Sequence, residues 1–321
     1  MNTGYIEAIQ KEKRTFSFAT WKEASRPRML SLGFSSGIVT AAVAYLNGVF
    51  DLWTMILEIM LATVLLVVSC WADEYGDLEK GVDNDHRLGP HRPLQRGELT
   101  LEEVLKGCKI GTAVAMLVGT MLIFYSFARN GFDTPIMLLY FTVGLFAIWA
   151  MFAYTMGEKP YGYNGWGDIS AYFFYGVVAG IGGYYLYAQT LDWTVLLPMS
   201  SVGLLFTSTI NLQNLRDFDN DKEYGKFTTA VKLGKKRAIA YHYVLVITSI
   251  ILYILFPIVH GMDNVLNYLF ILTMVPLVNH LRGFRKLISS EASPSKLDTL
   301  MWPLTRGMGI VAIAFSLCVC L

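Results

Sequence analysis

The sequence predicts an all-α integral membrane protein with nine transmembrane helices. Hydrophobic residues make up 54% of the 321 residues and the mean hydropathy is +0.44, which excludes an ordinary soluble domain. Apolar stretches of roughly 18 to 24 residues recur along the chain, and this length crosses about 30 Å of hydrocarbon. The pattern lacks the short alternating segments that are typical of a membrane β-barrel.

The predicted spans are joined by short loops on one side and long loops on the other. Arg26-Pro27-Arg28 marks the start of the first span, because proline suits the first turn of a helix. Residues 1–25 are predicted to form a cytoplasmic amphipathic lead-in, and residues 26–321 a single polytopic domain. The nine predicted spans are 29–49, 52–72, 110–128, 134–155, 169–190, 193–213, 239–259, 264–281 and 303–321.

Basic residues divide unevenly between the two sides that nine spans define. One side takes the N-terminal segment and the loops at 73–109 and 216–237, whereas the other side takes only Arg129. By the positive-inside rule, the basic side is cytoplasmic. The long loops, which carry nearly all the unusual polar residues, therefore face the cytoplasm.

An acidic cluster follows the second span. Asp73 and Asp77 are four residues apart, so their carboxylates point to one face of a helix, and Asp83 follows in the loop. Carboxylates beside a bilayer are costly and are kept when they bind something. The cluster predicts a binding site, whereas Glu58, within the same span, is expected to lie near the outer interface.

A second acidic cluster follows the sixth span. Asn214, Asp217 and Asp221 form an i, i+3, i+7 stripe on one helix face, and Asp219 is expected to face away. Like charges this close repel each other, and divalent cations relieve that repulsion. Magnesium prefers a few carboxylates together with water and phosphate oxygens. The two clusters therefore predict Mg²⁺ ions that hold a diphosphate between them.

The loop after the first cluster is basic and rich in glycine and proline. Arg87, Arg92 and Arg96 suit bidentate contact with phosphate oxygens, although anchoring the loop at the membrane by positive charge is the alternative. A diphosphate at the surface of an apolar interior indicates a polyprenyl diphosphate. Metal ions would stabilise its departing diphosphate.

At these residues the chain resembles the UbiA-type intramembrane prenyltransferases. It is most similar to the branch that prenylates 1,4-dihydroxy-2-naphthoate in menaquinone biosynthesis. Asp73, Asp77 and Asp83 follow the longer first motif of that branch, with Asp73 where the family usually has Asn. The other matching segments are Arg87-Leu88-Gly89-Pro90-His91-Arg92, Asn214-Leu215-Arg216-Asp217 with Asp221, Gly225-Lys226, and Pro160-Tyr161-Gly162-Tyr163 with Gly167-Asp168-Ile169.

The resemblance implies nine helices around a central cavity that cytoplasmic loops cap, in a bacterial inner membrane. It implies magnesium-dependent transfer of a polyprenyl group to 1,4-dihydroxy-2-naphthoate with loss of the acceptor's carboxylate, which gives a demethylmenaquinone. Among the acidic residues, Asp77 and Asp217 are expected to be essential for turnover. The metal ligands implied are Asp73, Asp77, Asp83, Asp217 and Asp221, and the diphosphate ligands are Arg87, Arg92, Lys222, Lys159 and Asn214.

The inner loop at 154–168 is expected to lie where the acceptor enters. Tyr154 and Lys159 belong to it, and Asp168 closes it. The Asp168 carboxylate suits a base on the acceptor hydroxyl, or else an ordinary helix N-cap. Further along, His280 and the basic segment 282–286 are expected to anchor the eighth helix, with a phosphate contact as the alternative.

Two alternatives stay open. Within the same enzyme class, the acceptor could be 4-hydroxybenzoate, homogentisate or a chlorophyllide. A cation-coupled transporter is the alternative from another class, but transporters place their charges near the bilayer midplane on broken helices. The acids of this chain collect at one face instead, which favours the transferase.

Overall fold

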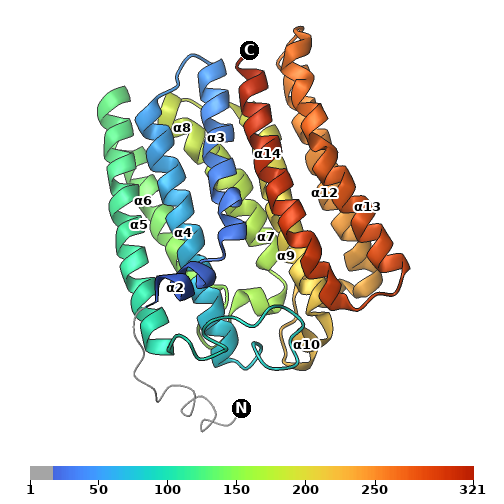
Figure 1. Ribbon diagram of the computed structural model, residues 1–321. Coiled ribbons are helices and arrows are strands. Elements are labelled where there is room, and N and C mark those ends of the chain that lie inside the picture. The colour runs from blue at the N-terminus through green and yellow to red at the C-terminus, as the bar shows by residue number, and fades with distance from the viewer. Residues whose placement is uncertain (1–16) are drawn as a thin grey trace.

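The computed structural model describes residues 17–321, which form a bundle of long helices (Figure 1). Within that part, nine helical segments are long and apolar enough to cross a bilayer, and no strand is present. The predicted fold class is therefore confirmed. Of the predicted lead-in, residues 1–16 lie outside the described part, and the short helix α2 (Phe18–Ala24) follows them.

The first five spans run from η1 to α8. The fifth includes a π-helical segment, η3, of ten residues. In such segments the backbone hydrogen bonds join residues five apart, and they are frequent at functional sites. The elements are η1 (Pro27–Met29) with α3 (Leu30–Leu46), α4 (Leu52–Glu79), α5 (Leu101–Asn130), α6 (Thr134–Ala153), η2 (Tyr161–Asn164) in a loop, and α7 (Gly167–Tyr172) with η3 (Phe173–Gly182) and α8 (Gly183–Ala188).

The last four spans run from η4 to α14, and two short helices lie between the sixth and seventh spans. The elements are η4 (Trp193–Val195) with α9 (Leu196–Arg216), α10 (Phe218–Glu223), α11 (Thr229–Leu233), α12 (Lys235–Val259), η5 (Val265–Met274) with α13 (Val275–Ser289), and η6 (Pro294–Leu300) with α14 (Met301–Val319).

Several helices extend beyond the predicted spans on the side of the long loops. The second helix continues from the predicted residue 72 to Glu79, and the third begins at Leu101 instead of residue 110. Thr100 and Glu103 form a capping box that starts the third helix. Hydropathy marks only the apolar part of a helix, so these polar turns were missed. As a result, Asp73 and Asp77 lie on the last turns of α4.

The centre of the bundle is α9, which packs against α3, α12, α14 and η3. Of the apolar window of this span, 78% is buried inside the protein. Gly203 of α9 lies against Gly176 of η3 so closely that a Cβ added at Gly203 would come within 2.9 Å of the Gly176 Cα atom. Small residues allow such close approach of two helices. The second aspartate motif therefore begins at the end of the most enclosed helix.

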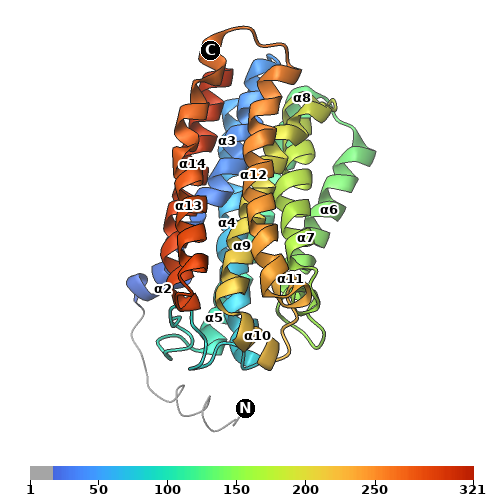
Figure 2. The ribbon, with the colours of Figure 1, turned by 90° about the vertical axis from the view of Figure 1, so that its right-hand side faces the viewer.

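The two ends of the bundle differ (Figures 1 and 2). We call the end formed by residues 80–100, 154–166 and 217–234 the loop end, and the opposite end, where the chain terminates, the far end. At the loop end, amides join the two motif-bearing segments. Asn84 Nδ2 donates to Asn220 Oδ1 at 2.9 Å, and Asn220 Nδ2 donates to the Val82 carbonyl oxygen at 2.9 Å.

Candidate functional site

A cavity of about 800 Å³ runs inside the bundle. It extends along α4 from Glu58 to Asp77, which is roughly 28 Å at the rise of an α-helix. Its walls come mainly from apolar side chains of α4, α5, α6 and η3, as in most ligand sites. Apart from Glu58, its charged lining residues gather at the loop end: Arg26, Asp73, Asp77, Arg87, Arg92, Asp217, Asp221 and Lys226.

Asp73 binds two arginines that come from different segments. Its Oδ2 atom lies 2.7 Å from Arg26 Nη2 and 3.0 Å from Arg92 Nη1. Arg26 adopts a left-handed backbone conformation with φ of 48°, and also donates to the Cys70 carbonyl oxygen at 3.4 Å. Sequence reasoning treated Arg26 only as part of a helix start, so its place in the cavity wall was missed.

Asp77 is held by a lysine and a tyrosine. Lys226 Nζ lies 2.8 Å from both carboxylate oxygens, and the Tyr163 hydroxyl donates to Oδ1 at 2.7 Å. Lys226 reaches the site because Gly225, with φ of +75°, reverses the chain after α10. Burial opposes the charge of Lys226, but Asp77 and Asp221 outweigh it and raise the pKa of the lysine. Lys226 and Asp77 therefore form a buried ion pair on the cavity wall.

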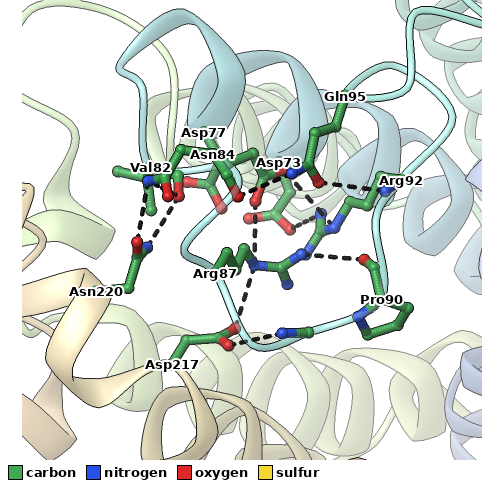
Figure 3. A network of polar contacts seen from close by, with 12 residues as sticks. Asp73, Asp77, Val82, Asn84, Arg87, Pro90, Arg92, Gln95, Asp217 and Asn220 are labelled. Carbon is green, nitrogen blue, oxygen red and sulfur yellow. Dashed lines mark hydrogen bonds and ion pairs between the residues drawn. The ribbon is translucent and has the colours of Figure 1, made fainter. Parts of the chain in front are cut away.

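Asp83 lies behind the cavity wall beside two arginines, Arg87 and Arg92. Figure 3 shows these arginines near Asp73 and Asp217. Its carboxylate oxygens are 3.1 Å from Arg87 Nε and 3.7 Å from Arg92 Nε, although neither oxygen has a hydrogen-bond partner among residues 17–321. Burial raises the pKa of Asp83 to about 7 despite Arg87. The structure thus brings Asp83 to the predicted site, where it contacts arginines that line the cavity.

Asp217 connects the second motif to the basic loop. Its Oδ2 atom lies 3.2 Å from Arg87 Nε, and its Oδ1 atom accepts the Gly89 amide at 3.1 Å. Burial acts to raise the pKa of Asp217, but the hydrogen bonds from Arg216 and the charge of Arg87 outweigh it, so the pKa is lowered. Asp217 is therefore held as a carboxylate that faces the cavity.

The rest of the second motif lies as its spacing predicts. Asn214 and Asp221 line the cavity, and burial raises the pKa of Asp221 to about 8 although Lys226 lies nearby. Asp219 faces away, with its side chain 74% exposed and paired with Lys235 at 2.7 Å. Even the helix break at Asp217, between α9 and α10, leaves the three motif residues on one wall.

Three predicted phosphate ligands lie elsewhere. Lys222 is exposed because it follows Asp221 directly on α10 and so points to another side of that helix. Lys159 is exposed in the turn before Pro160. Arg96 pairs with Glu23 at 2.9 Å, so it is occupied at the surface. The structure brings none of these three to the cavity wall.

The predicted acceptor residues separate into two positions. Tyr154 lines the cavity, and its hydroxyl lies against Gly167, where an added Cβ would come within 2.9 Å of it. Asp168 is buried in the first turn of α7 and does not line the cavity. The N-cap of that helix is Trp166, so the N-cap role, given as the alternative to a base for Asp168, is wrong.

Glu58 lies in the second turn of α4, at the end of that helix opposite Asp73 and Asp77. It is 8% exposed, lines the cavity and accepts a hydrogen bond from the Tyr187 hydroxyl at 3.2 Å, none of which the sequence had indicated. One further expectation is corrected. His280 does not anchor the eighth helix at the membrane surface. It is buried, and its Nε2 atom lies 2.8 Å from His242 Nε2. Hydropathy does not show which side of a helix faces its neighbours. Glu58 and His280 are buried because they lie on that side of their helices.

Residues 35–302 match the UbiA prenyltransferase family. The chain belongs to that family. A relative from Haemophilus influenzae, named 1,4-dihydroxy-2-naphthoate octaprenyltransferase, is 33% identical over 92% of this chain and 94% of its own length. An Escherichia coli protein of the same name is also 33% identical, with the same coverage. The resemblance found in the motifs is therefore confirmed over most of the chain.

Solved UbiA structures share the fold. A UbiA homologue from Archaeoglobus fulgidus bound to GPP and Mg²⁺ has a TM-score of 0.56 at 15% identity, over 92% of this chain and 99% of that one. An apo UbiA homologue from Aeropyrum pernix has a TM-score of 0.59 at 18% identity, over 88% and 98%. This UbiA chain is thus an integral membrane protein with the helical bundle of those structures.

The donor groups of this UbiA site suit a magnesium ion that is shared with a phosphate. Among residues 17–321, no three acidic, histidine or cysteine side chains converge into a ready metal cage. Four carboxylates and one amide nevertheless line the same end of the cavity, and Mg²⁺ is usually held by one or two carboxylates together with substrate phosphates. The lining residues with these oxygen donors are Asp73, Asp77, Asn214, Asp217 and Asp221.

Proposed function

We propose that the protein transfers a polyprenyl group from a polyprenyl diphosphate to 1,4-dihydroxy-2-naphthoate, with Mg²⁺ as cofactor. The observation that carries the proposal is the cavity. Its walls are mainly apolar, and carboxylates gather with arginine and lysine side chains at one end. The apolar walls suit the prenyl tail of a polyprenyl diphosphate, and the charged end suits its diphosphate head together with a metal ion. The names of the relatives supply the acceptor.

The loop end would bind the head group of the donor. Arg26, Arg92 and Lys226 line the cavity beside carboxylates and would turn their charge to the diphosphate oxygens. Asp77 and Asp217, together with Asp73, Asn214 and Asp221, would hold Mg²⁺. When bound, Mg²⁺ neutralises charge that develops on the departing diphosphate. Asp83, behind the wall, would keep Arg87 and Arg92 in position.

In the transfer, the bond between the allylic carbon and the diphosphate oxygen breaks, and its electron pair leaves with the diphosphate. The ring carbon that carries the acceptor's carboxylate forms the new carbon–carbon bond, and that carboxylate leaves as carbon dioxide. The product is a demethylmenaquinol. The enclosed apolar walls would keep water from the allylic centre.

Tyr154 would contact the acceptor, because it lines the cavity at the edge of the 154–166 loop. Asp168 is buried next to Gly167, which packs against the Tyr154 hydroxyl. Asp168 would therefore help to position Tyr154. It would not itself take a proton from the acceptor, because it does not line the cavity. The bacterial relatives support a bacterial inner membrane. The uneven distribution of basic residues supports a loop end on the cytoplasmic side.

A product assay by mass spectrometry tests the proposal. Purified protein in detergent is mixed with 1,4-dihydroxy-2-naphthoate and geranyl diphosphate, with either Mg²⁺ or EDTA. A prenylated, decarboxylated naphthoquinol that forms only with Mg²⁺ is the expected result. Product only with 4-hydroxybenzoate or homogentisate would overturn the acceptor, and no transfer to any acceptor by folded protein would overturn the activity.

A further inference from the structure

Arg216 is a buried arginine with two acidic partners. It ends α9 and is 2% exposed. Its Nε and Nη2 atoms donate to the two carboxylate oxygens of Asp217 at 3.0 and 2.6 Å. Its Nη1 atom donates to Asp298 Oδ1 at 2.5 Å. Asp298 belongs to η6, 82 residues further along the chain.

The position of this guanidinium is fixed from a third side by the basic loop. A Cβ atom added at Gly89 would collide with Arg216 Nη2 and would come within 2.9 Å of Arg87 Nη2. The Gly89 amide, meanwhile, donates to Asp217. The backbone at Gly89 therefore packs directly on the Arg216–Asp217 pair. A shift of Arg216 would disturb the position of Asp217 and that of the loop at Gly89.

Asp298 itself lies outside the cavity. Neither it nor Arg216 lines the wall, whereas Asp217 does. The Asp298 side chain is 27% exposed, and it also pairs with Arg28 at 3.1 Å. The contacts that connect Asp298 to the cavity wall run through Arg216 to Asp217.

We propose that Asp298 is a positioning residue for Asp217: it shares the charge of Arg216 and so leaves the Asp217 carboxylate able to bind a cation. This inference rests on the proposed function, in which Asp217 is a metal ligand. A buried guanidinium needs a counter-charge. Without Asp298, Asp217 becomes the sole acidic side chain bound to Arg216, and it interacts less strongly with a cation in the cavity.

The size of the effect follows from comparable cases. Groups that hold metal ligands from behind typically change metal affinity by about 10- to 100-fold when they are mutated. We expect Asp298→Asn to raise the half-saturating Mg²⁺ concentration by about that factor. The Asp298→Glu variant, which keeps the charge on a longer side chain, should restore most of the affinity.

The test measures Mg²⁺ binding both with and without turnover. The first readout is the Mg²⁺ concentration for half-maximal prenyl transfer. The second is the rise in Tm of the full-length protein in detergent when Mg²⁺ is titrated in the presence of inorganic pyrophosphate, because a ligand of the native state raises Tm. The second readout needs no acceptor, so it reports on Asp298 even if the proposed acceptor or reaction is wrong.

Two control variants separate positioning from simple support of the fold. Arg28→Gln breaks the other ion pair of Asp298 and leaves Arg216 intact. Asp219→Asn breaks the exposed pair with Lys235 close to the same motif. Asp219→Asn should leave the half-saturating Mg²⁺ concentration within about threefold of wild type, since an exposed pair contributes little. Arg28→Gln should stay within the same limit, because Arg28 does not line the cavity and its ion pair is with Asp298 and not with Asp217.

An Asp298→Asn protein with the Mg²⁺ requirement of wild type would overturn the inference. An equal loss in Arg28→Gln would also overturn it, because Asp298 would then act by joining η1 to η6. If Asp298→Asn does not fold, Asp298→Ser removes the same charge with a small side chain and carries the same expectations.

Discussion

The two ends of the cavity are built in different ways. At the loop end, charged side chains from the segment before α3, from α4, from the following loop and from the second motif form a network of ion pairs. At the far end, Glu58 is the one charged residue among the described residues that line the cavity, and the Tyr187 hydroxyl donates to its carboxylate. The first end is held together by ion pairs between residues far apart in the sequence, whereas the second is a wall of packed helices.

This difference predicts at which end of the cavity a substitution should reduce activity most. A contact at the loop end depends on the position of several loops, and each charge there has an opposite charge beside it. Removing one charge leaves another buried without its partner, which is costly. At the far end a substitution changes the shape and polarity of the wall and leaves the network of ion pairs intact.

The largest effect is expected at Asp77. Asp77→Asn keeps the shape of the side chain but removes a charge that Lys226 and the bound cation need, so kcat/KM should fall by about 1,000-fold. Steady-state kinetics with saturating Mg²⁺ measure it. The matched control is Asp85→Asn, because Asp85 is exposed in the loop that follows. Activity of Asp77→Asn within tenfold of wild type would show that the loop end does not work through this carboxylate.

A smaller effect is expected at Lys226. Lys226→Met keeps the length of the side chain and removes a charged hydrogen-bond donor, so the KM for the prenyl diphosphate should rise by about 10- to 100-fold. Lys222→Met and Lys159→Met are controls, since both lysines are exposed outside the cavity. If either control raises the donor KM as much as Lys226→Met does, the structure has assigned the wrong lysine to the diphosphate.

The smallest effect is expected at the far end. An apolar tail that reaches Glu58 must lie against a carboxyl group, which is unfavourable. Glu58→Leu should therefore raise kcat/KM for longer prenyl diphosphates relative to geranyl diphosphate by roughly threefold to tenfold. Competition between two donors in one reaction measures the ratio. Glu58→Gln keeps a polar wall and should leave the ratio near that of wild type; an unchanged ratio in Glu58→Leu would mean that the tail ends elsewhere.

Much of the fold and part of the site could be predicted from the sequence. Nine apolar stretches gave the spans because hydropathy reports burial in lipid directly. Helical spacing placed Asp73 with Asp77, and Asn214 with Asp221, because residues four and seven apart share a helix face. These local patterns need no knowledge of tertiary structure.

The positively charged side chains that complete the site could not be predicted in the same way. Arg26 lies 47 residues from Asp73, and Lys226 lies 149 residues from Asp77, so their contacts depend on how the helices pack. Lys222 was predicted as a diphosphate ligand, but the lysine that lines the cavity is Lys226, which follows the turn at Gly225. Asp298 is further still from any motif, and only the folded chain shows that it contacts Arg216.

The pair of amides at the loop end has a consequence for evolution. Asn84 and Asn220 join the two motif-bearing segments through hydrogen bonds in which each amide has a defined donor and acceptor role. A substitution of either residue alone leaves the other with an unmatched buried group. Among descendants of a common ancestor, positions 84 and 220 should therefore change together, and a chimera that joins two relatives between these positions should inherit a mismatch there.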